Sequence, residues 1–177
     1  IPREARALCA LPSKNKEDIR IDLNVFAAEV EAEYSVTEPN VRFVLQSTDP
    51  VSMAIDKDTT LRLLRAVHAA ANGVFMMSQD MPGLVETSSN LASIKIKENN
   101  QKVNGRSQRS STLSSRRDMA ETIQAVFELA GAMVDVGDGY PGWKPNPNSP
   151  LLAVAIDSYK QLFGVEPKVK AIHAGLE

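Results

Sequence analysis

Apolar residues recur at the three- and four-residue spacing of an α-helix in four stretches of the chain. Residues typical of helix boundaries flank these stretches: the capping-box pair Ser115 and Asp118 precedes the third, and Gly164 follows the fourth. The spacing therefore predicts a helix that opens at Ser13 and carries its apolar stripe to Val30. Further helices are predicted over about 58–71, 115–130 and 150–163.

Alternating apolar and polar residues, the two-residue period of a strand, mark the segments between these helices. Glu98-Asn99-Asn100 joins two of the segments and is typical of a hairpin turn. Residues 75–82, which are rich in methionine, are predicted to form a loop. The predicted strands are 3–11, 40–48, 84–97, 101–112, 132–136 and 167–173.

Strands that alternate with helices and include a hairpin favour an α+β fold. The expected architecture is a ferredoxin-like α/β sandwich, in which helices cover one face of a mostly antiparallel sheet, followed by a C-terminal α–β piece. A stretch rich in glycine and proline, 137–149, separates the two parts. We therefore expect one domain over residues 1–136 and a second unit over 137–177.

The composition is that of an ordinary globular protein and excludes several classes of partner. Of the 177 residues, 43% are apolar and 24% are charged, and the formal net charge of −2 would not attract nucleic acid or an anionic membrane. No apolar run approaches the 18 residues that a membrane span requires. The single cysteine excludes a disulfide framework and a multi-cysteine metal site. We expect a protein of a reducing compartment, without nucleic-acid or membrane partners.

Residues with versatile chemistry are few. Only two histidines are present, and most hydrolytic metal sites and nucleophile–histidine triads need a histidine supported by further ligands. A self-sufficient enzyme is therefore not expected. The chain also starts at Ile1-Pro2-Arg3 and stops just after a strand-like segment, a pattern that suggests a fragment of a longer protein.

Four reactive or charged residues have an ordinary structural explanation. His68 lies on the apolar side of a predicted helix, and Cys9 alternates with alanines on a predicted strand, so both are expected in or beside the core. Arg116 and Arg117 fall in the first turn of a predicted helix, where they oppose the helix dipole. We expect both arginines to be solvated.

The remaining candidates are ligand-binding residues. Arg109 ends a predicted strand, where a guanidinium can hold a carboxylate through two hydrogen bonds, although a surface ion pair is the more frequent role. Trp143, the only tryptophan, lies in a turn and either lines a pocket or plugs the edge of the core. His173 and Glu177 follow a strand, but no third ligand for a metal lies nearby.

The C-terminal run Ile172-His173-Ala174-Gly175-Leu176-Glu177 is one of several short motifs that occur in the order of a known family. No single motif is specific, but the ordered set spans the chain and is strong. In this set the chain resembles the aminoacyl-histidine dipeptidases (Xaa-His dipeptidases, peptidase D), which are cytosolic di-zinc metallopeptidases. The other matching segments are Ile1-Pro2-Arg3-Glu4, Asn72-Gly73-Val74, Val85-Glu86-Thr87-Ser88-Ser89-Asn90, Arg109-Ser110-Ser111, Tyr140-Pro141-Gly142-Trp143 and Asn148-Ser149-Pro150.

The resemblance implies a cytoplasmic two-domain enzyme in which a zinc-binding catalytic domain carries a ferredoxin-like lid that also forms a homodimer. Residues 1–136 would be part of that lid, and 137–177 would return into the catalytic domain. The zinc ligands, the catalytic carboxylate and a lid histidine of the family would lie outside this chain, so none of its residues is assigned to catalysis or to metal. The residues that the resemblance places near the substrate are Arg109, as carboxylate clamp, and Tyr140, Trp143, His173 and Glu177.

The leading hypothesis is thus a fragment of a zinc dipeptidase for Xaa-His dipeptides, which positions substrate and by itself binds no zinc and hydrolyses nothing. The alternative is a free-standing ferredoxin-like module for binding or dimerisation. Spacing does not decide whether Arg106 or Arg109 is the clamp, and Arg109 is favoured because Ser110-Ser111 follow it.

Overall fold

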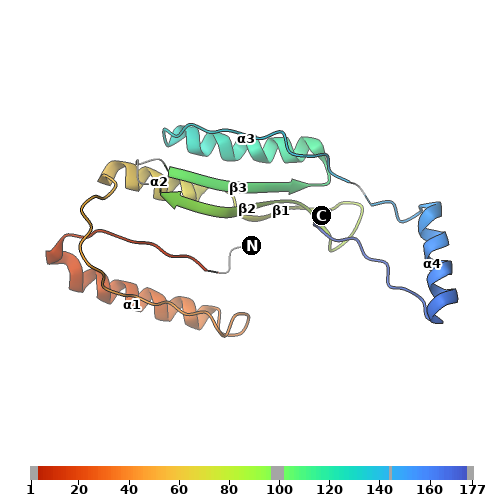
Figure 1. The fold of residues 1–177 in the computed structure, drawn as a ribbon, viewed down its shortest axis with the longest axis horizontal. Coiled ribbons are helices and arrows are strands. Elements are labelled where there is room, and N and C mark those ends of the chain that lie inside the picture. Colours follow the sequence, from red (N-terminus) through yellow and green to blue (C-terminus); the bar gives the residue numbers. More distant parts are fainter. Residues whose placement is uncertain (1–3, 97–101, 144, 175–177) are drawn as a thin grey trace. The chain divides into compact units, whose positions relative to one another are not determined.

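The computed structural model describes residues 4–96, 102–143 and 145–174, which fall into two compact units (Figure 1). One unit runs over Glu4–Ile55, and the other holds the described residues from Asp56 onward. The described residues contain four α-helices and one antiparallel sheet of three strands, so the predicted α+β class is confirmed. The domain boundary between residues 136 and 137 stays a prediction.

The first unit is built on one long helix. A 3₁₀ turn, Ser13–Asn15, leads into α1 (Lys16–Glu33), as the apolar spacing predicts. The chain then returns along this helix: the ring of Phe43 meets that of Phe26 edge to face at 5.8 Å, and the Phe43 N–H donates to Glu31 Oε1 at 2.9 Å. The return therefore packs on α1 through side chains.

The two strands predicted in this unit are wrong. In the described part, neither 4–11 nor 40–48 has ladder hydrogen bonds to a neighbouring strand, which are what define a strand. Cys9 is accordingly exposed and not in a core. An alternating pattern shows that a segment can present an apolar face, but that face can rest on a helix as well as in a sheet.

The sheet of the second unit is antiparallel throughout. Its strands are β1 (Gly73–Met77), β2 (Val85–Ile96) and β3 (Lys102–Ser110), in the spatial order β1-β2-β3. The strands β2 and β3 confirm the predicted pair, whereas the Glu98-Asn99-Asn100 turn lies outside the described residues. The loop predicted over 75–82 is wrong in its first half, because β1 pairs with β2 through Met77.

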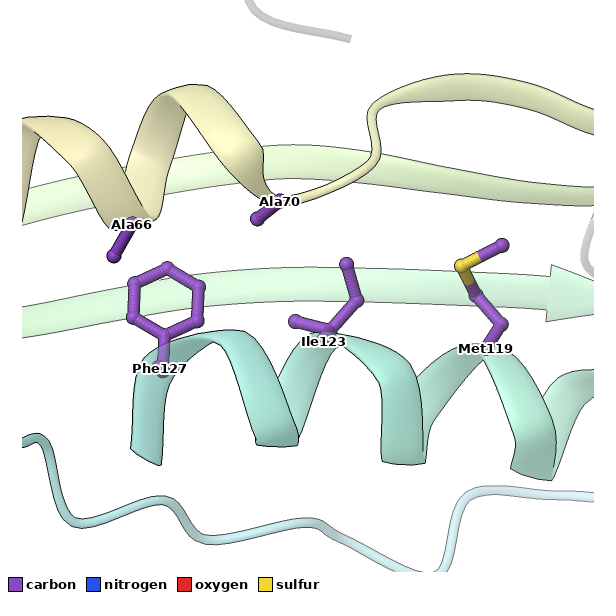
Figure 2. Packing of buried hydrophobic residues seen from close by; sticks show 5 residues of the cluster. All are labelled: Ala66, Ala70, Met119, Ile123 and Phe127. Carbon is purple, nitrogen blue, oxygen red and sulfur yellow. The ribbon is translucent and has the colours of Figure 1, made fainter. Parts of the chain in front are cut away.

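Two amphipathic helices pack against each other, and the second of them also packs on the sheet, against β2 and β3 (Figure 2). The first, α2 (Lys57–Ala69), begins at Asp56, whose side chain accepts a hydrogen bond from the Thr59 N–H at 2.9 Å. The second, α3 (Leu113–Leu129), begins two residues before the predicted capping residue Ser115. Both helices confirm the predicted periodicity.

The core lies between these helices. Figure 2 shows Ala66 and Ala70 of α2 facing Met119, Ile123 and Phe127 of α3. Met119 is completely buried. The three α3 residues are four positions apart, so they form one stripe that is covered by the small side chains of α2.

Beyond α3 the chain does not form the predicted strand over 132–136. Gly131, with φ of +81°, ends the helix, and the chain runs back along α3 (Figure 1). Val134 packs against the core from this returning segment. Its apolar side chain is thereby half-buried against the core, although the segment pairs with no strand in the described residues.

The last helix is α4 (Pro150–Phe163), which ends at the left-handed Gly164 as predicted. None of its residues is buried, and Leu151, Leu162 and Phe163 are exposed by 63 to 77%. The strand predicted over 167–173 is wrong, because the described residues of that segment make no ladder hydrogen bonds. Of the expected C-terminal α–β piece, only the helix is present.

Candidate functional site

A serine on the sheet and a histidine from the C-terminal segment form the centre of the site. Along β2, Thr87 and Ser89 are buried, so Ser88 between them lies on the opposite face from theirs. His173 lies beyond α4, and its Nε2 is 2.7 Å from Ser88 Oγ. Residues that are 85 positions apart in the sequence are thus joined by one hydrogen bond.

Arg109 shares this face of the sheet. In the β2–β3 register it stands directly opposite Ser88, and side chains of opposed residues lie on the same side. The Arg109 side chain is exposed. A guanidinium with free access to solvent, next to a serine and a histidine, can accept a carboxylate ligand.

The environment of His173 keeps its ring neutral. Burial lowers the pKa of His173 from its ordinary 6.5, and the positive charge of Arg109 lowers it further, while a hydrogen bond with the Val85 backbone acts in the opposite direction. The neutral form of the imidazole is therefore favoured at pH 7. The positive charge of this corner of the sheet thus resides on Arg109.

The turn that carries Tyr140 and Trp143 is attached to α3, the helix that follows β3. Arg116 of α3 donates from Nη1 to the Tyr140 carbonyl at 2.7 Å and from Nη2 to the Asp138 carbonyl at 2.9 Å. The expectation that Arg116 is solvated is therefore wrong: these carbonyls outweigh the unfavourable helix dipole. Both aromatic side chains are exposed, Tyr140 by 64% and Trp143 by 69%, so Trp143 does not plug the core.

A cleft of about 230 Å³ adjoins the turn. Its wall includes Glu86, two residues before Ser88, and Ser111, two residues after Arg109. Asp80 adds a second carboxylate to the lining. The cleft is therefore polar on one side, and it lies next to the Arg109 end of the two strands.

Several sequence-predicted residues lie elsewhere. Glu177 and the side chain of Arg106 are outside the described part of the chain. His68 is exposed on α2, which corrects its expected place in or beside the core. Among the described residues no group of three histidine, cysteine, aspartate or glutamate side chains could hold a metal ion, and no helix is long and apolar enough to cross a membrane.

Sequence reasoning missed two residues of this arrangement. Ser88 lies within the matching segment Val85–Asn90, but nothing in that segment predicts its link to His173. Arg116 gave no positive signal, because its acceptors are backbone carbonyls more than 20 residues away. Only the spatial arrangement identifies either contact.

Comparisons with known proteins relate the chain to dipeptidases. No protein-family model matches the chain. The cytosol non-specific dipeptidase of Escherichia coli (strain K12) is 32% identical over 181 residues, which cover all of this chain and 36% of that protein. The crystal structure of an aminoacylhistidine dipeptidase from Vibrio alginolyticus matches with a TM-score of 0.76 and 34% identity, over 94% of this chain and 34% of that one.

The similarity thus extends over the whole chain, in sequence and in fold, but the chain spans only about a third of the length of these relatives. Identity of this level over a complete chain, together with the shared fold, reflects common ancestry. The chain is therefore a homologue of the cytosol non-specific and aminoacylhistidine dipeptidases over about a third of their length, which is consistent with a fragment of that family.

Proposed function

We propose that this chain is the part of a dipeptidase that binds the C-terminal carboxylate of the substrate. The observation that carries the proposal is the placement of Arg109 opposite Ser88 and beside His173, in a chain similar from end to end to two dipeptidases. A dipeptide ends in a free carboxylate, and a guanidinium binds that group through two parallel hydrogen bonds.

The neighbours of Arg109 suit this task. Neutral His173 accepts or donates hydrogen bonds without adding a second charge, so a bound carboxylate is neutralised by the arginine alone. Exposed Tyr140 and Trp143 offer aromatic surfaces to a substrate side chain. By its resemblance to the family, Glu177 would lie near the same pocket. Fixing the substrate in this way lowers the entropic part of the barrier.

The specificity that we propose is for Xaa-His dipeptides. The name of the relative from Vibrio alginolyticus specifies aminoacylhistidine substrates, whereas that of the relative from Escherichia coli specifies none. An imidazole side chain stacks well on an aromatic surface such as that of Trp143. The contribution of this chain would be recognition, and the peptide bond would be cleaved by groups elsewhere in the enzyme.

Zinc is the cofactor that we propose for the whole enzyme. A zinc ion polarises the peptide carbonyl and supplies an activated water when it is bound. The described residues of this chain do not provide a set of three ligands, so they do not fit the metal. We assign the ligands to the remainder of the enzyme and derive no step through the metal from this chain.

A cytoplasmic location and a homodimer formed through the lid complete the proposal. The location is supported by the name of the Escherichia coli relative, a cytosol dipeptidase. A free-standing binding module is less well supported, because the similarity continues past the sheet into α4. The exposed apolar residues of α4 also require covering by more protein.

The test uses the full-length enzyme and a pair of substrates, Ala-His and its C-terminal amide, which lacks the carboxylate charge. The wild-type enzyme should prefer Ala-His, and Arg109→Met should remove that preference by raising KM for Ala-His about 10- to 100-fold, the loss expected for a charge-assisted hydrogen-bonded pair. Arg65→Met, an exposed arginine on α2, is the matched control. An unchanged preference in Arg109→Met would refute the assignment.

Zinc dependence and specificity need separate measurements. Removal of metal by a chelator should abolish hydrolysis, and addition of zinc should restore it. Ala-His should then be cleaved with a higher kcat/KM than Ala-Gly or Ala-Leu. Hydrolysis that persists after complete metal removal would refute the cofactor, and equal rates for the three dipeptides would refute the specificity while leaving the carboxylate clamp intact.

A further inference from the structure

The hydrogen bonds that attach the Asp138–Trp143 turn to α3 come from a single side chain. Both hydrogen bonds described above start from the planar guanidinium of Arg116, which is half-buried, and end on carbonyls two residues apart. Two bonds from one rigid fork fix the orientation of the turn as well as its distance. A single donor such as an ammonium would leave the turn free to pivot.

The glycines of the turn show how closely it is seated. Gly139, between the two acceptor residues, has φ of +64°, and a Cβ at this position would overlap the Arg116 guanidinium. A Cβ on Gly142 would lie 2.6 Å from the Ser110 carbonyl oxygen and 2.8 Å from that of Ser111. The turn therefore approaches the Arg116 side chain of α3 at Gly139 and the backbone at the end of β3 at Gly142.

This seating fixes the position of two aromatic side chains that no core packing holds. Tyr140 and Trp143 are both mostly exposed, so few contacts with neighbouring side chains restrain them. The Tyr140 carbonyl is itself an acceptor of the Arg116 bond, and Trp143 follows Gly142 directly. Gly142 abuts Ser110, the residue next to Arg109. The backbone attachment thus keeps the turn that carries both aromatic residues at the end of β3 where Arg109 lies.

We propose that Arg116 is a positioning residue for substrate selection: by fixing the Asp138–Trp143 turn at the Arg109 end of β3, it holds Tyr140 and Trp143 where they meet the side chain of the substrate's C-terminal residue. This inference rests on the proposed function, in which Arg109 binds the carboxylate of that same residue. The carboxylate and the side chain of the C-terminal residue are bonded to the same α-carbon. The surface next to Arg109 is therefore the one that meets this side chain. Arg116 itself touches no substrate.

The experiment compares Arg116→Gln and Arg116→Lys with Arg117→Gln in the full-length enzyme. Arg117 is the next residue of α3 and is exposed, so Arg117→Gln removes a charge without touching the turn. The readout is the ratio of kcat/KM for Ala-His to that for Ala-Gly, which has no C-terminal side chain to recognise. Arg116→Gln should lower this ratio about tenfold, the loss expected for one charge-assisted hydrogen bond. Arg116→Lys should lie between, and Arg117→Gln should leave the ratio unchanged.

A spectroscopic measurement separates positioning from general destabilisation. The fluorescence of Trp143, taken as the difference between enzyme and Trp143→Phe, should show faster local depolarisation in Arg116→Gln than in the wild type. A merely structural role would lower kcat/KM for both dipeptides by the same factor and would leave the ratio unchanged. That result, or an unaltered depolarisation, would overturn the inference.

The two proposals fail in different ways. If the wild-type enzyme hydrolyses no dipeptide, the proposed function fails and the role of Arg116 fails with it. If Arg109→Met loses the preference for Ala-His over its C-terminal amide, but Arg116→Gln keeps the wild-type ratio of kcat/KM for Ala-His to that for Ala-Gly, only the role of Arg116 fails. Loss of the first preference in Arg109→Met and a lowered ratio in Arg116→Gln, with the ratio unchanged in Arg117→Gln, support both.

Discussion

Replacing Gly142 with alanine adds a single methyl group where the turn meets the end of β3. The added carbon would lie 2.6 Å from the Ser110 carbonyl oxygen, whereas a close carbon–oxygen contact is about 3.3 Å. With the two carbonyls in place, the turn must therefore move by about 0.7 Å to relieve this contact. A shift of that size would lengthen the 2.7 Å bond between Arg116 and the Tyr140 carbonyl to about 3.4 Å, beyond useful hydrogen-bond length.

The free-energy cost follows from two opposing effects. Overpacking of this kind destabilises by about 1 to 3 kcal/mol. Alanine also reduces the conformational entropy of the unfolded chain, which stabilises the folded state by about 0.4 to 1 kcal/mol. We therefore expect Gly142→Ala to lower the free energy of unfolding by about 1 to 2 kcal/mol and to raise KM for Ala-His through the displaced turn.

Gly137 offers a matched control five residues earlier in the same stretch. A Cβ at Gly137 would have no atom within 4 Å, and its φ is not in the left-handed region. Only the effect on the unfolded chain then remains, so Gly137→Ala should stabilise by about 0.4 to 1 kcal/mol. Urea unfolding of both full-length variants, followed by circular dichroism, measures the difference. Equal effects of the same sign at the two glycines would refute the close approach of the turn to the sheet.

Two further predictions concern β2 and its contact with His173. The buried Ser89 hydroxyl has no hydrogen-bond partner among the described residues, so Ser89→Ala should stabilise the fold by about 1 kcal/mol. Thr87→Val should destabilise it by about the same amount, because it breaks the 2.9 Å hydrogen bond to Ser110. Unfolding midpoints of the two variants that shift in the same direction would contradict this. The pKa of His173 in the folded chain lies below 6.5, so its contribution to stability is complete above pH 6.5 and is lost as the pH falls through the lowered pKa. His173→Gln should therefore lose less stability than the wild type between pH 7.5 and 5.5, and a parallel loss in urea titrations at these pH values would exclude the shift.

The amino-acid sequence by itself determined the helices. The apolar stripe of Met119 and Ile123 predicts α3, and the glycine at position 164 predicts the end of α4. Both signals are local because a helix is made of contacts within four residues. The hairpin strands β2 and β3 were also predictable, since they pair with a close neighbour in the chain. All the residues that make such local contacts lie within a short stretch of the sequence.

Tertiary structure decided the other strands. Residues 40–48 and 132–136 alternate like strands, yet both rest on helices, while Gly73–Met77, a run without alternation, pairs with β2. A strand needs a partner, and no window of sequence specifies which partner a segment will find.

The site divides in the same way. Arg109 could be singled out because a strand-end arginine next to Ser110-Ser111 resembles a family motif. The bond between Ser88 and His173, and the hold of Arg116 on the Asp138 and Tyr140 carbonyls, were decided only by the fold. Hydrogen bonds reach about 3 Å, so they depend on where distant segments come to lie, and that position is set by packing along the whole chain.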